Sequence, residues 1–466
     1  MGTRLALASW LAITLASCTG ATSPSPLDAT PLDDVAIDTP AIDSTSSDVT
    51  ANDAARDAQI ADTAPSDGGA DVVARDVTVD APSTDVALDA TADVAADVAL
   101  DVTADVAADR PIADAAVDAS ASVTTLRVRY ASRSGSIALR GSVTPLNWDR
   151  GVTFRRVADD TWEWTSSDLR APLEWKPLLD DATWSRGPNY RANPGATVVV
   201  FPHFVNGIGE FARTYPTFTS TILGNRRGVW IYLPPSYGEN TAARFPVVYM
   251  HDGQNLFDPR AAFGGVAWDA DGAMNGGAES GAIREAILVG VENTAARIDE
   301  YTPTRDAMYG GGNGDAYLRM LIEEVKPMID RDYRTLPDRA NTALVGSSLG
   351  GLISSYAGVR RADVFGLIGA LSPSTWWNDR VLLREVASTP TRAARPLRVY
   401  VDSGNAGASM DGVADTRELA ATYRSVGYVE GSTLHYVVQD GAQHNELYWS
   451  MRLPGALAFL LGPRDP

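Results

Sequence analysis

The residues best suited to chemistry form the sequence Gly346-Ser347-Ser348-Leu349-Gly350. A short apolar run at 342–345 precedes this motif, and a helix-like segment follows it. A G-x-S-x-G motif between a strand and a helix is typical of a sharp turn that exposes a serine hydroxyl as a nucleophile. The N–H group of Leu349, at the start of the helix, would then face a developing oxyanion. Glycine and serine are common residues, so the motif alone also fits an accidental loop.

A serine nucleophile needs a base, and the chain has four histidines: His203, His251, His435 and His444. Only His444 follows a predicted strand late in the chain, as the order serine, acid, histidine of an α/β-hydrolase requires. Three aspartates are candidates for the acid: Asp402 at a strand end, and Asp411 and Asp415 in the following loop. We favour Asp411, because Asp415 precedes a helix-like segment and could simply cap it.

The elements that must position these residues lie between about residue 220 and the carboxyl end. Strands are predicted at 229–233, 246–251, 287–291, 342–345, 367–371, 398–402 and 434–438, and helices include 317–330, 351–358 and 416–426. This alternation predicts an α/β fold with a mainly parallel sheet covered on both faces. Ligand-binding residues gather at the carboxyl ends of such strands, where the segments 252–255 and 372–377, Ser348 and His444 all lie.

These features resemble the esterase D and enterochelin esterase-like branch of the α/β-hydrolases, which includes feruloyl and acetylxylan esterases of carbohydrate esterase family 1. The matching stretches run through the whole domain: Tyr232-Leu-Pro-Pro-Ser-Tyr237, Val248-Tyr-Met-His-Asp-Gly-Gln-Asn-Leu-Phe257, Arg297 with Glu300-Tyr-Thr-Pro303, Gly312-Asn-Gly-Asp-Ala-Tyr317, Asp332-Tyr-Arg-Thr335, the motif around Ser348, Ser372-Pro-Ser-Thr-Trp-Trp377 and His444-Asn-Glu446. The resemblance implies an α/β-hydrolase in which Ser348 is the nucleophile and His444 passes its proton to the leaving alcohol.

The resemblance also implies roles for neighbouring residues. The N–H groups of Leu349 and of Gly253 or Gln254 would form the oxyanion hole, and Trp376 and Trp377 would line the acyl or sugar pocket. The family often places its acid in a G-T-x-(D/E) motif directly after the strand. Here that register reads Gly404-Asn-Ala-Gly407, so the usual position holds Gly407, and the loop instead offers Asp411 and Asp415, with Asp402 at the strand end. His251 and Asp252 are interpreted as structural residues that hold the oxyanion loop.

Residues 123–205 contain alternating runs and five of the eleven tryptophans: Trp148, Trp162, Trp164, Trp175 and Trp184. Alternation with period 2, broken by turn residues, predicts an immunoglobulin-like β-sandwich. The order of Gly141 and Trp148, Trp162-Glu-Trp164, Trp175-Lys176, Asp181 and Trp184, Asn189 and Pro202 resembles early-set modules of carbohydrate-binding module family 48. A tryptophan face could stack on sugar rings. Alternatively, the tryptophans fill the core and the domain only docks on its neighbour.

The amino end has the features of an export signal. Arg4 precedes an apolar segment at 5–15, which is too short to remain as a membrane span. The segment ends in Leu15-Ala-Ser-Cys18, which resembles a bacterial lipobox, although an ordinary cleavage site beside an incidental cysteine is the alternative. Diacylated Cys18 would anchor an exported protein to a membrane. Thr19, and not Asp, follows the cysteine, so we expect the outer membrane or the cell surface.

An acidic segment follows the cysteine. Between residues 21 and 120 there are 22 Asp and three Arg, so about −19 of the net charge of −20 lies there. Residues 19–122 contain no aromatic residue from which a core could form, which predicts a disordered tether. Calcium binding is a weaker alternative, because the repeats lack the glycine turns and paired acidic ligands of calcium loops. No basic patch exists, which argues against a nucleic-acid partner.

The sequence therefore predicts four parts: a lipoprotein signal at 1–18, a linker at 19–122, a β-sandwich at 123–205 and an esterase domain at 206–466. One cysteine and four histidines, without an H-E-x-x-H motif, indicate neither a metal site nor a cofactor. We expect a serine carboxylic ester hydrolase that acts through an acyl-enzyme on feruloyl or acetyl esters of polysaccharide. A siderophore trilactone esterase and a non-catalytic glycan-binding lipoprotein are the alternatives.

Overall fold

The computed structural model describes residues 123–463 apart from 132–134, 206 and 389–395. The predicted signal, Cys18 and the acidic segment 19–122 therefore lie outside the described residues. In the described part of the chain, no helix is long and apolar enough to cross a membrane.

The first nine strands form a β-domain of two sheets that share one core. One sheet contains β4 (Arg155–Ala158), β5 (Thr161–Ser166), β1 (Thr124–Arg129) and β9 (Thr197–Val200), in that order. The other contains β3 (Val152–Thr153), β2 (Ile137–Gly141), β6 (Leu173–Leu179) and β7 (Thr183–Trp184), and β8 (Tyr190–Ala192) also pairs with β6. Because apolar side chains of both sheets meet in the core, this domain is the predicted β-sandwich.

Alternation along the strands decides which tryptophans are buried. In β1, Leu126 and Val128 point into the core and have no exposed surface. Trp162 and Trp175 lie in the same core, so the interpretation of the tryptophans as core residues holds for these two. Trp184 is instead 39% exposed, which leaves an aromatic ring on the surface of the domain.

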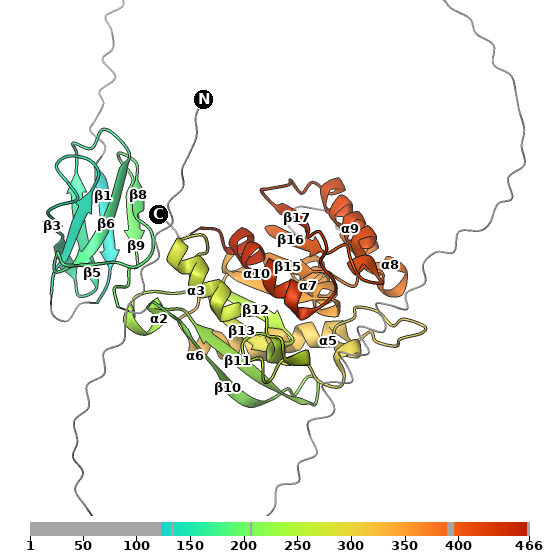
Figure 1. Ribbon diagram of the computed structural model, residues 1–466. Coiled ribbons are helices and arrows are strands. Elements are labelled where there is room, and N and C mark those ends of the chain that lie inside the picture. Colours follow the sequence, from blue (N-terminus) through green and yellow to red (C-terminus); the bar gives the residue numbers. More distant parts are fainter. Residues whose placement is uncertain (1–122, 132–134, 206, 389–395, 464–466) are drawn as a thin grey trace, which may run out of the picture. The chain divides into compact units, whose positions relative to one another are not determined.

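The remaining strands form one eight-stranded sheet (Figure 1), in the order β10 (Glu210–Thr219), β11 (Arg226–Leu233), β13 (Ile287–Val291), β12 (Val247–His251), β14 (Thr342–Ser347), β15 (Leu367–Leu371), β16 (Arg398–Ser403) and β17 (Leu434–Val438). β10 and β11 are antiparallel to their neighbours. All neighbours from β13 to β17 are parallel. The carboxyl ends of these six parallel strands therefore meet at one edge of the sheet.

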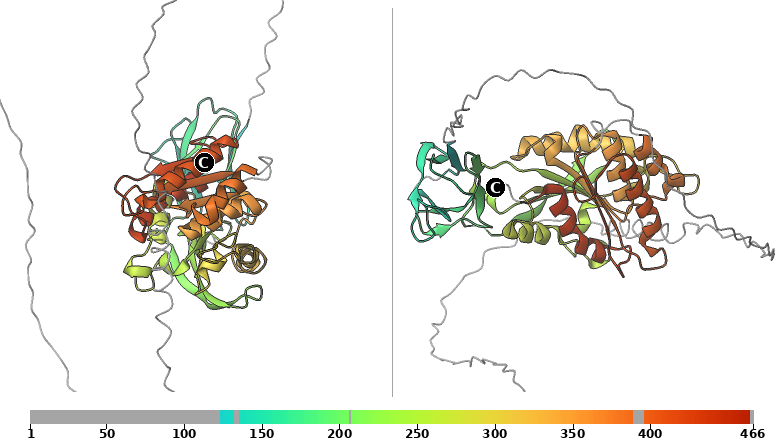
Figure 2. Two further views of the ribbon diagram at one scale, coloured as in Figure 1. Left: turned by 90° about the vertical axis from the view of Figure 1, so that its right-hand side faces the viewer. Right: turned by 90° about the horizontal axis from the view of Figure 1, so that it is seen from above.

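Helices cover both faces of this sheet (Figure 2). In β12, Val247 and Tyr249 face one core, and Val248 and Met250 face the other. The first core is covered by α5 (Gly314–Arg319), η3 (Met320–Val325), α6 (Lys326–Asp332), α7 (Leu349–Arg360), α8 (Trp377–Ser388) and α9 (Val413–Ser425). The second is covered by α3 (Ala270–Ser280) and α10 (Glu446–Leu461). Burial on both faces explains why the parallel strands are continuous apolar runs in the sequence.

The structure confirms the predicted α/β fold with a mainly parallel sheet. The bounds of β13, β15 and β17 coincide with the predicted ones. β10 and α10 were not predicted, and neither were the short helices α2 (Ser236–Glu239) and α4 (Arg297–Glu300). The loops that leave the carboxyl edge after β12, β14, β15, β16 and β17 carry the candidate site residues.

Candidate active site

Strand β14 ends in a sharp turn occupied by Ser348, which has φ 55° and ψ −123°. Such a backbone is strained for a residue with a side chain, and strain of this kind concentrates at functional positions. The turn has no room for a side chain at Gly346. A Cβ atom on Gly346 would lie 2.6 Å from Cδ2 of His251 and 2.8 Å from the backbone carbon of Gly350. The glycines of the motif therefore let the strand and helix α7 meet closely enough to expose the hydroxyl.

The turn presents Ser348 to His444, which lies in the loop between β17 and α10. Nε2 of His444 is 2.9 Å from Oγ of Ser348, and Nδ1 is 2.6 Å from Oδ1 of Asp411. An ionised carboxylate can only accept a hydrogen bond, so Nδ1 carries the proton. Nε2 is then free to accept the proton of the serine hydroxyl, a transfer that would make Ser348 a nucleophile.

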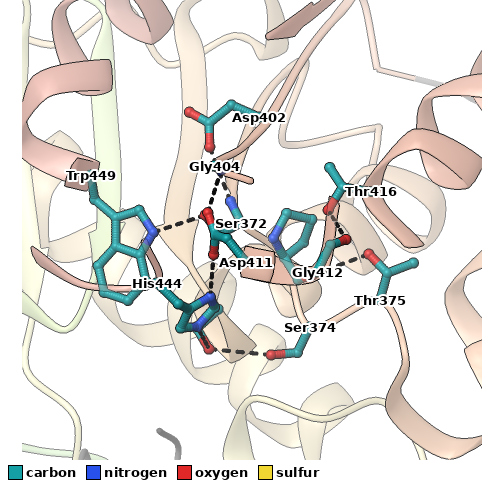
Figure 3. Close-up of polar contacts among 12 residues, drawn as sticks. Ser372, Ser374, Thr375, Asp402, Gly404, Asp411, Gly412, Thr416, His444 and Trp449 are labelled. Carbon is teal, nitrogen blue, oxygen red and sulfur yellow. Dashed lines mark hydrogen bonds and ion pairs between the residues drawn. The ribbon is translucent and has the colours of Figure 1, made fainter. Parts of the chain in front are cut away.

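Asp411 lies in η6 (Met410–Gly412), and its side chain has no exposed surface. Oδ2 accepts a hydrogen bond of 2.7 Å from Oγ of Ser372 and a second one from the N–H group of Gly404 (Figure 3). Burial by itself raises the pKa of Asp411. The hydrogen bond and the charge of His444, together with the hydrogen bonds from Gly404 and Ser372, lower this pKa below its ordinary value. The carboxylate is therefore ionised at neutral pH and orients His444.

The other two candidate acids have different partners. Asp415 lies in the first turn of α9, where its Oδ1 is 2.8 Å from Nη2 of Arg380. Asp402 lies in β16, and its Oδ2 is 3.0 Å from Nε of Arg452. Within the described part of the chain only Asp411 has its carboxylate on His444, so the geometry selects it among the three.

Sequence reasoning did not identify the side chains that hold Asp411. Oγ of Ser372 accepts hydrogen bonds from Nε1 of Trp449 at 3.0 Å and from Nη2 of Arg452 at 2.8 Å. The rings of Trp449 and His444 also pack in a T-shaped arrangement, with centroids 5.0 Å apart and an interplanar angle of 84°. Trp449 and Arg452 lie one turn apart in α10, directly after His444. That spacing is the one signal in the sequence that could have placed both side chains beneath the histidine.

Backbone donors for an oxyanion lie on loops that follow the adjacent strands β14 and β12. Leu349 is the first residue of α7, so its N–H group has no acceptor within the helix and lies at the positive end of the helix dipole. Gly253 and Gln254 follow β12 in η1 (Gly253–Asn255). A Cβ atom on Gly253 would lie 2.4 Å from the backbone carbon of Gly290, so only glycine allows this loop to lie so close to β13.

Buried polar residues anchor the same loop. The carboxylate of Asp252 accepts hydrogen bonds from Nε and Nη2 of Arg297, both at 2.9 Å, and from Nδ2 of Asn293 at 2.8 Å. Nδ1 of His251 lies 2.9 Å from the hydroxyl of Tyr317. Burial lowers the pKa of His251 to about 3, so its ring is neutral at physiological pH. These contacts support the interpretation of His251 and Asp252 as structural residues.

The two tryptophans expected in a substrate pocket have different environments. Trp377 has no exposed surface, packs in the core beneath α8, and donates a hydrogen bond from Nε1 to the carbonyl of Thr304 at 2.8 Å. The structure therefore contradicts its prediction as a pocket-lining residue, because α8 begins at Trp377 and its ring packs into the core. Trp376 is half-buried, and its ring lies 5.5 Å from that of Tyr309.

Comparison with known proteins shows that the domain containing this site is similar in sequence to esterases. Residues 220–460 match the profile of a family described as "Putative esterase". The match covers more than half of the chain. It includes the residues that the structure brings together, Ser348, Asp411 and His444.

Three curated relatives are similar to parts of the chain. "Uncharacterized protein YbbA" of Bacillus subtilis is 28% identical over 248 residues, which are 51% of this chain and 94% of the relative. "Endo-1,4-beta-xylanase/feruloyl esterase" of Xylanibacter ruminicola is 27% identical over 172 residues, 35% of this chain and 22% of the relative. "Iron(III) salmochelin esterase" of Escherichia coli is 29% identical over 221 residues, 47% of this chain and 46% of the relative. The chain thus spans less than half the length of the last two.

Proposed function

Because this chain belongs to the esterase family matched over residues 220–460, and is a carboxylic ester hydrolase with an α/β-hydrolase fold, we propose that Ser348, His444 and Asp411 form its catalytic triad. One observation carries the proposal. Contacts of hydrogen-bond length run without a break from Oγ of Ser348 through both ring nitrogens of His444 to Oδ1 of Asp411. The acid at the end of this series is buried and ionised, as a group that orients an imidazolium must be.

The reaction proceeds through an acyl-enzyme. Oγ of Ser348 attacks the ester carbonyl carbon while Nε2 of His444 takes its proton. The N–H groups of Leu349 and of Gly253 or Gln254 stabilise the oxyanion of the tetrahedral intermediate, and one such donor contributes about 3 kcal/mol. Collapse of the intermediate breaks the bond to the alcohol, which leaves with the proton from His444. Water then attacks the acyl-Ser348 by the same route, and no cofactor takes part.

The proposed substrates are feruloyl or acetyl esters attached to carbohydrate. Similarity to a relative whose name includes feruloyl esterase supports this class. The β-sandwich adds a surface suited to sugar. The exposed ring of Trp184 lies 6.2 Å from the ring of Trp148, and the guanidinium carbon of Arg140 lies 5.2 Å from the centre of the Trp184 ring. Aromatic rings beside a polar group are a common setting for sugar rings.

A siderophore trilactone is the second candidate substrate. Its support is the similarity to a relative named as an iron(III) salmochelin esterase, which covers 47% of this chain. Both candidates need the same serine chemistry, so the triad does not distinguish them. Rates on acetylxylan, methyl ferulate and enterobactin, measured side by side, separate the two classes.

Replacing the nucleophile tests the triad. Ser348→Ala is expected to lower kcat on 4-nitrophenyl acetate by about 10⁴-fold or more, because no other group can form the acyl-enzyme. Ser347→Ala is the matched control, since it removes the same hydroxyl from the neighbouring residue, and it should stay near wild-type activity. A wild-type protein that hydrolyses none of the four esters would instead support the third interpretation, a non-catalytic glycan-binding protein.

A further inference from the structure

A second serine hydroxyl lies against the nucleophile. Oγ of Ser374, in the loop that follows β15, is 3.2 Å from Oγ of Ser348 (Figure 3). Each of the two residues is 3% exposed, so their contact is buried. The hydroxyl group of Ser374 is therefore held beside the atom that would attack the ester.

The direction of this hydrogen bond follows from the charge of Asp411. Because Nδ1 of His444 donates to the ionised carboxylate, Nε2 can only accept, and it takes the hydrogen of Ser348 Oγ. A hydroxyl group has one hydrogen, so Ser348 has none left to give to Ser374. Ser374 is therefore the donor and Oγ of Ser348 is the acceptor.

The main chain holds Ser374 in place independently of its side chain. β14 and β15 are parallel, and their hydrogen bonding continues past the strand ends. The N–H group of Ser348 donates to the carbonyl of Leu371, and the N–H group of Ser374 donates to the carbonyl of Ser348, both at 3.0 Å. A Cβ atom on Gly351 would lie 3.1 Å from Cα of Pro373, so the loop also packs closely against α7. Removal of the Ser374 hydroxyl would leave all these contacts intact.

The length of the contact indicates when it stabilises the site. Hydrogen bonds between hydroxyl groups are most often about 2.7–2.8 Å long, so at 3.2 Å this one is weak in the resting protein. Negative charge on the acceptor shortens such a bond to about 2.5–2.7 Å and roughly doubles its strength. Ser374 therefore stabilises Ser348 most when Oγ carries negative charge, which is the condition for lowering a reaction barrier.

The two half-reactions use Oγ of Ser348 in opposite ways. In acylation it is the nucleophile, and a hydrogen bond from Ser374 eases the loss of its proton but also holds the electrons that must attack. In deacylation it is the leaving group. The bond between the acyl carbon and Oγ breaks, the electron pair stays on Oγ, and Nε2 of His444 returns the proton. A donor to Oγ only assists this second step, because it stabilises the charge before the proton arrives.

We propose that Ser374 is a further catalytic residue, whose hydroxyl donates a hydrogen bond to Oγ of Ser348 and assists its departure from the acyl-enzyme. The hydrogen of Ser374 stays on its own oxygen, and His444 supplies the proton that regenerates Ser348. The proposal rests on the proposed function, because it assumes an acyl-enzyme on Ser348. It adds to that function a group that accelerates deacylation more than acylation.

The test measures the two half-reactions separately in the full-length protein. With 4-nitrophenyl pivalate, whose hindered acyl group slows hydrolysis, the burst of 4-nitrophenolate gives the rate of acylation. The acyl-enzyme is then separated from the ester by gel filtration, and its decay, followed by intact mass, gives the rate of deacylation. In Ser374→Ala deacylation should be about tenfold slower than in the wild type, the usual effect of losing one hydrogen bond to a charged group, and acylation should change by less than about threefold.

Ser354→Ala is the matched control, because it also removes a buried serine hydroxyl, one that donates to the carbonyl of Gly350 within α7. Both of its rates should equal those of the wild type. Ser374→Thr keeps the hydroxyl group and should restore deacylation toward the wild-type rate.

Three results would refute the proposal. They are a loss of acylation in Ser374→Ala as large as its loss of deacylation, rates in that variant that match the control, and an acyl-enzyme that decays as slowly in Ser374→Thr as in Ser374→Ala. The first of these would make Ser374 only a support for the turn at Ser348. Failure of the proposed function looks different, since the wild type would then form no acyl-enzyme or Ser348→Ala would still form one.

Discussion

At the scale of single residues, the hydroxyl group of Ser372 fixes the orientation of the Asp411 carboxylate by donating a hydrogen bond to it. Oγ of Ser372 has one hydrogen and two lone pairs, and both Trp449 and Arg452 can only donate to it. Its own hydrogen must therefore point to Oδ2 of Asp411. With Oδ2 occupied in this way, Oδ1 faces His444, and the histidine is held in the tautomer that accepts the serine proton.

Ser372→Ala should therefore lower kcat while KM changes little. The substitution removes a hydrogen bond to the carboxylate and leaves two buried donors without their acceptor, a loss of about 1–3 kcal/mol that corresponds to roughly 5- to 150-fold in rate. Trp449→Phe, which keeps the ring against His444 but removes the N–H group, should lower kcat by a smaller factor. Steady-state kinetics on a short-chain aryl ester measure both effects.

The control for this series is Ser425→Ala, at an exposed position near the end of α9, which should match the wild type. A normal kcat in Ser372→Ala would show that Gly404 and Arg452 position Asp411 without the serine. A rise in KM with constant kcat would instead place Ser372 in substrate binding, which contradicts its position behind the acid.

How far the site could be predicted depends on how local each residue's signal is. Ser348 is marked by its flanking glycines, and His444 by its place after the last strand. Asp411 was one of three candidates, because the acid is chosen by the path of a loop and not by a local pattern. For Trp449 and Arg452 on α10 the only sequence signal is their spacing of one helical turn, and it does not show which group they bind, since they reach Ser372 only when the helix packs against the sheet. Trp377 was misjudged because burial at the start of α8 is a tertiary property.

At the scale of elements, the parallel strands were predictable and the edges of the domain were not. Strands β12 to β16 are buried on both faces, so each is a continuous apolar run. β10 is an edge strand with almost every residue exposed, so its sequence lacks that signal. α10 contains Pro454 in its interior and apolar residues on several sides, which hides the helical period. Both elements depend on tertiary packing for their conformation.

Buried His251, at the end of strand β12, makes the stability of the folded protein depend on pH. His251 is 1% exposed, and burial lowers its pKa to about 3, whereas the unfolded chain has a histidine pKa near 6.5. Below pH 6.5 the unfolded state therefore takes up a proton that the folded state does not. The free energy of unfolding should fall with acidification, by about 2 kcal/mol between pH 7 and pH 5 from this residue alone.

His251→Gln isolates this contribution, because glutamine can retain a hydrogen bond to the hydroxyl of Tyr317 but does not titrate. Urea unfolding followed by tryptophan fluorescence at pH 5, 6 and 7 gives the slope for each protein. The wild type should lose about 2 kcal/mol more than the variant between pH 7 and pH 5. Equal slopes would mean that His251 takes up a proton in the folded protein as well. That result would contradict the prediction that its buried ring stays neutral.

At the scale of the whole molecule, most of the net charge lies in a different part of the chain from the proposed catalytic residues. Residues 21–120 carry about −19 of the net charge of −20, and the residues that follow are close to neutral. The sequence predicts a charged tether, which repulsion between like charges would extend. We propose that this tether links a lipid anchor at Cys18 to an esterase domain that acts at a distance from the membrane surface.

Cys18→Ser tests the anchor in the full-length chain, expressed in a Gram-negative host. Two acyl chains bury many CH₂ groups, each worth about 0.8 kcal/mol, so the wild type should sediment with the outer membrane. The variant should lose this anchor and appear in the soluble fraction, with unchanged activity on a short-chain ester because Cys18 lies far along the sequence from Ser348. Ser348→Ala is the converse control, since it should be inactive and still membrane-bound. A Cys18→Ser protein that sediments like the wild type would show that the cysteine is incidental to an ordinary export signal.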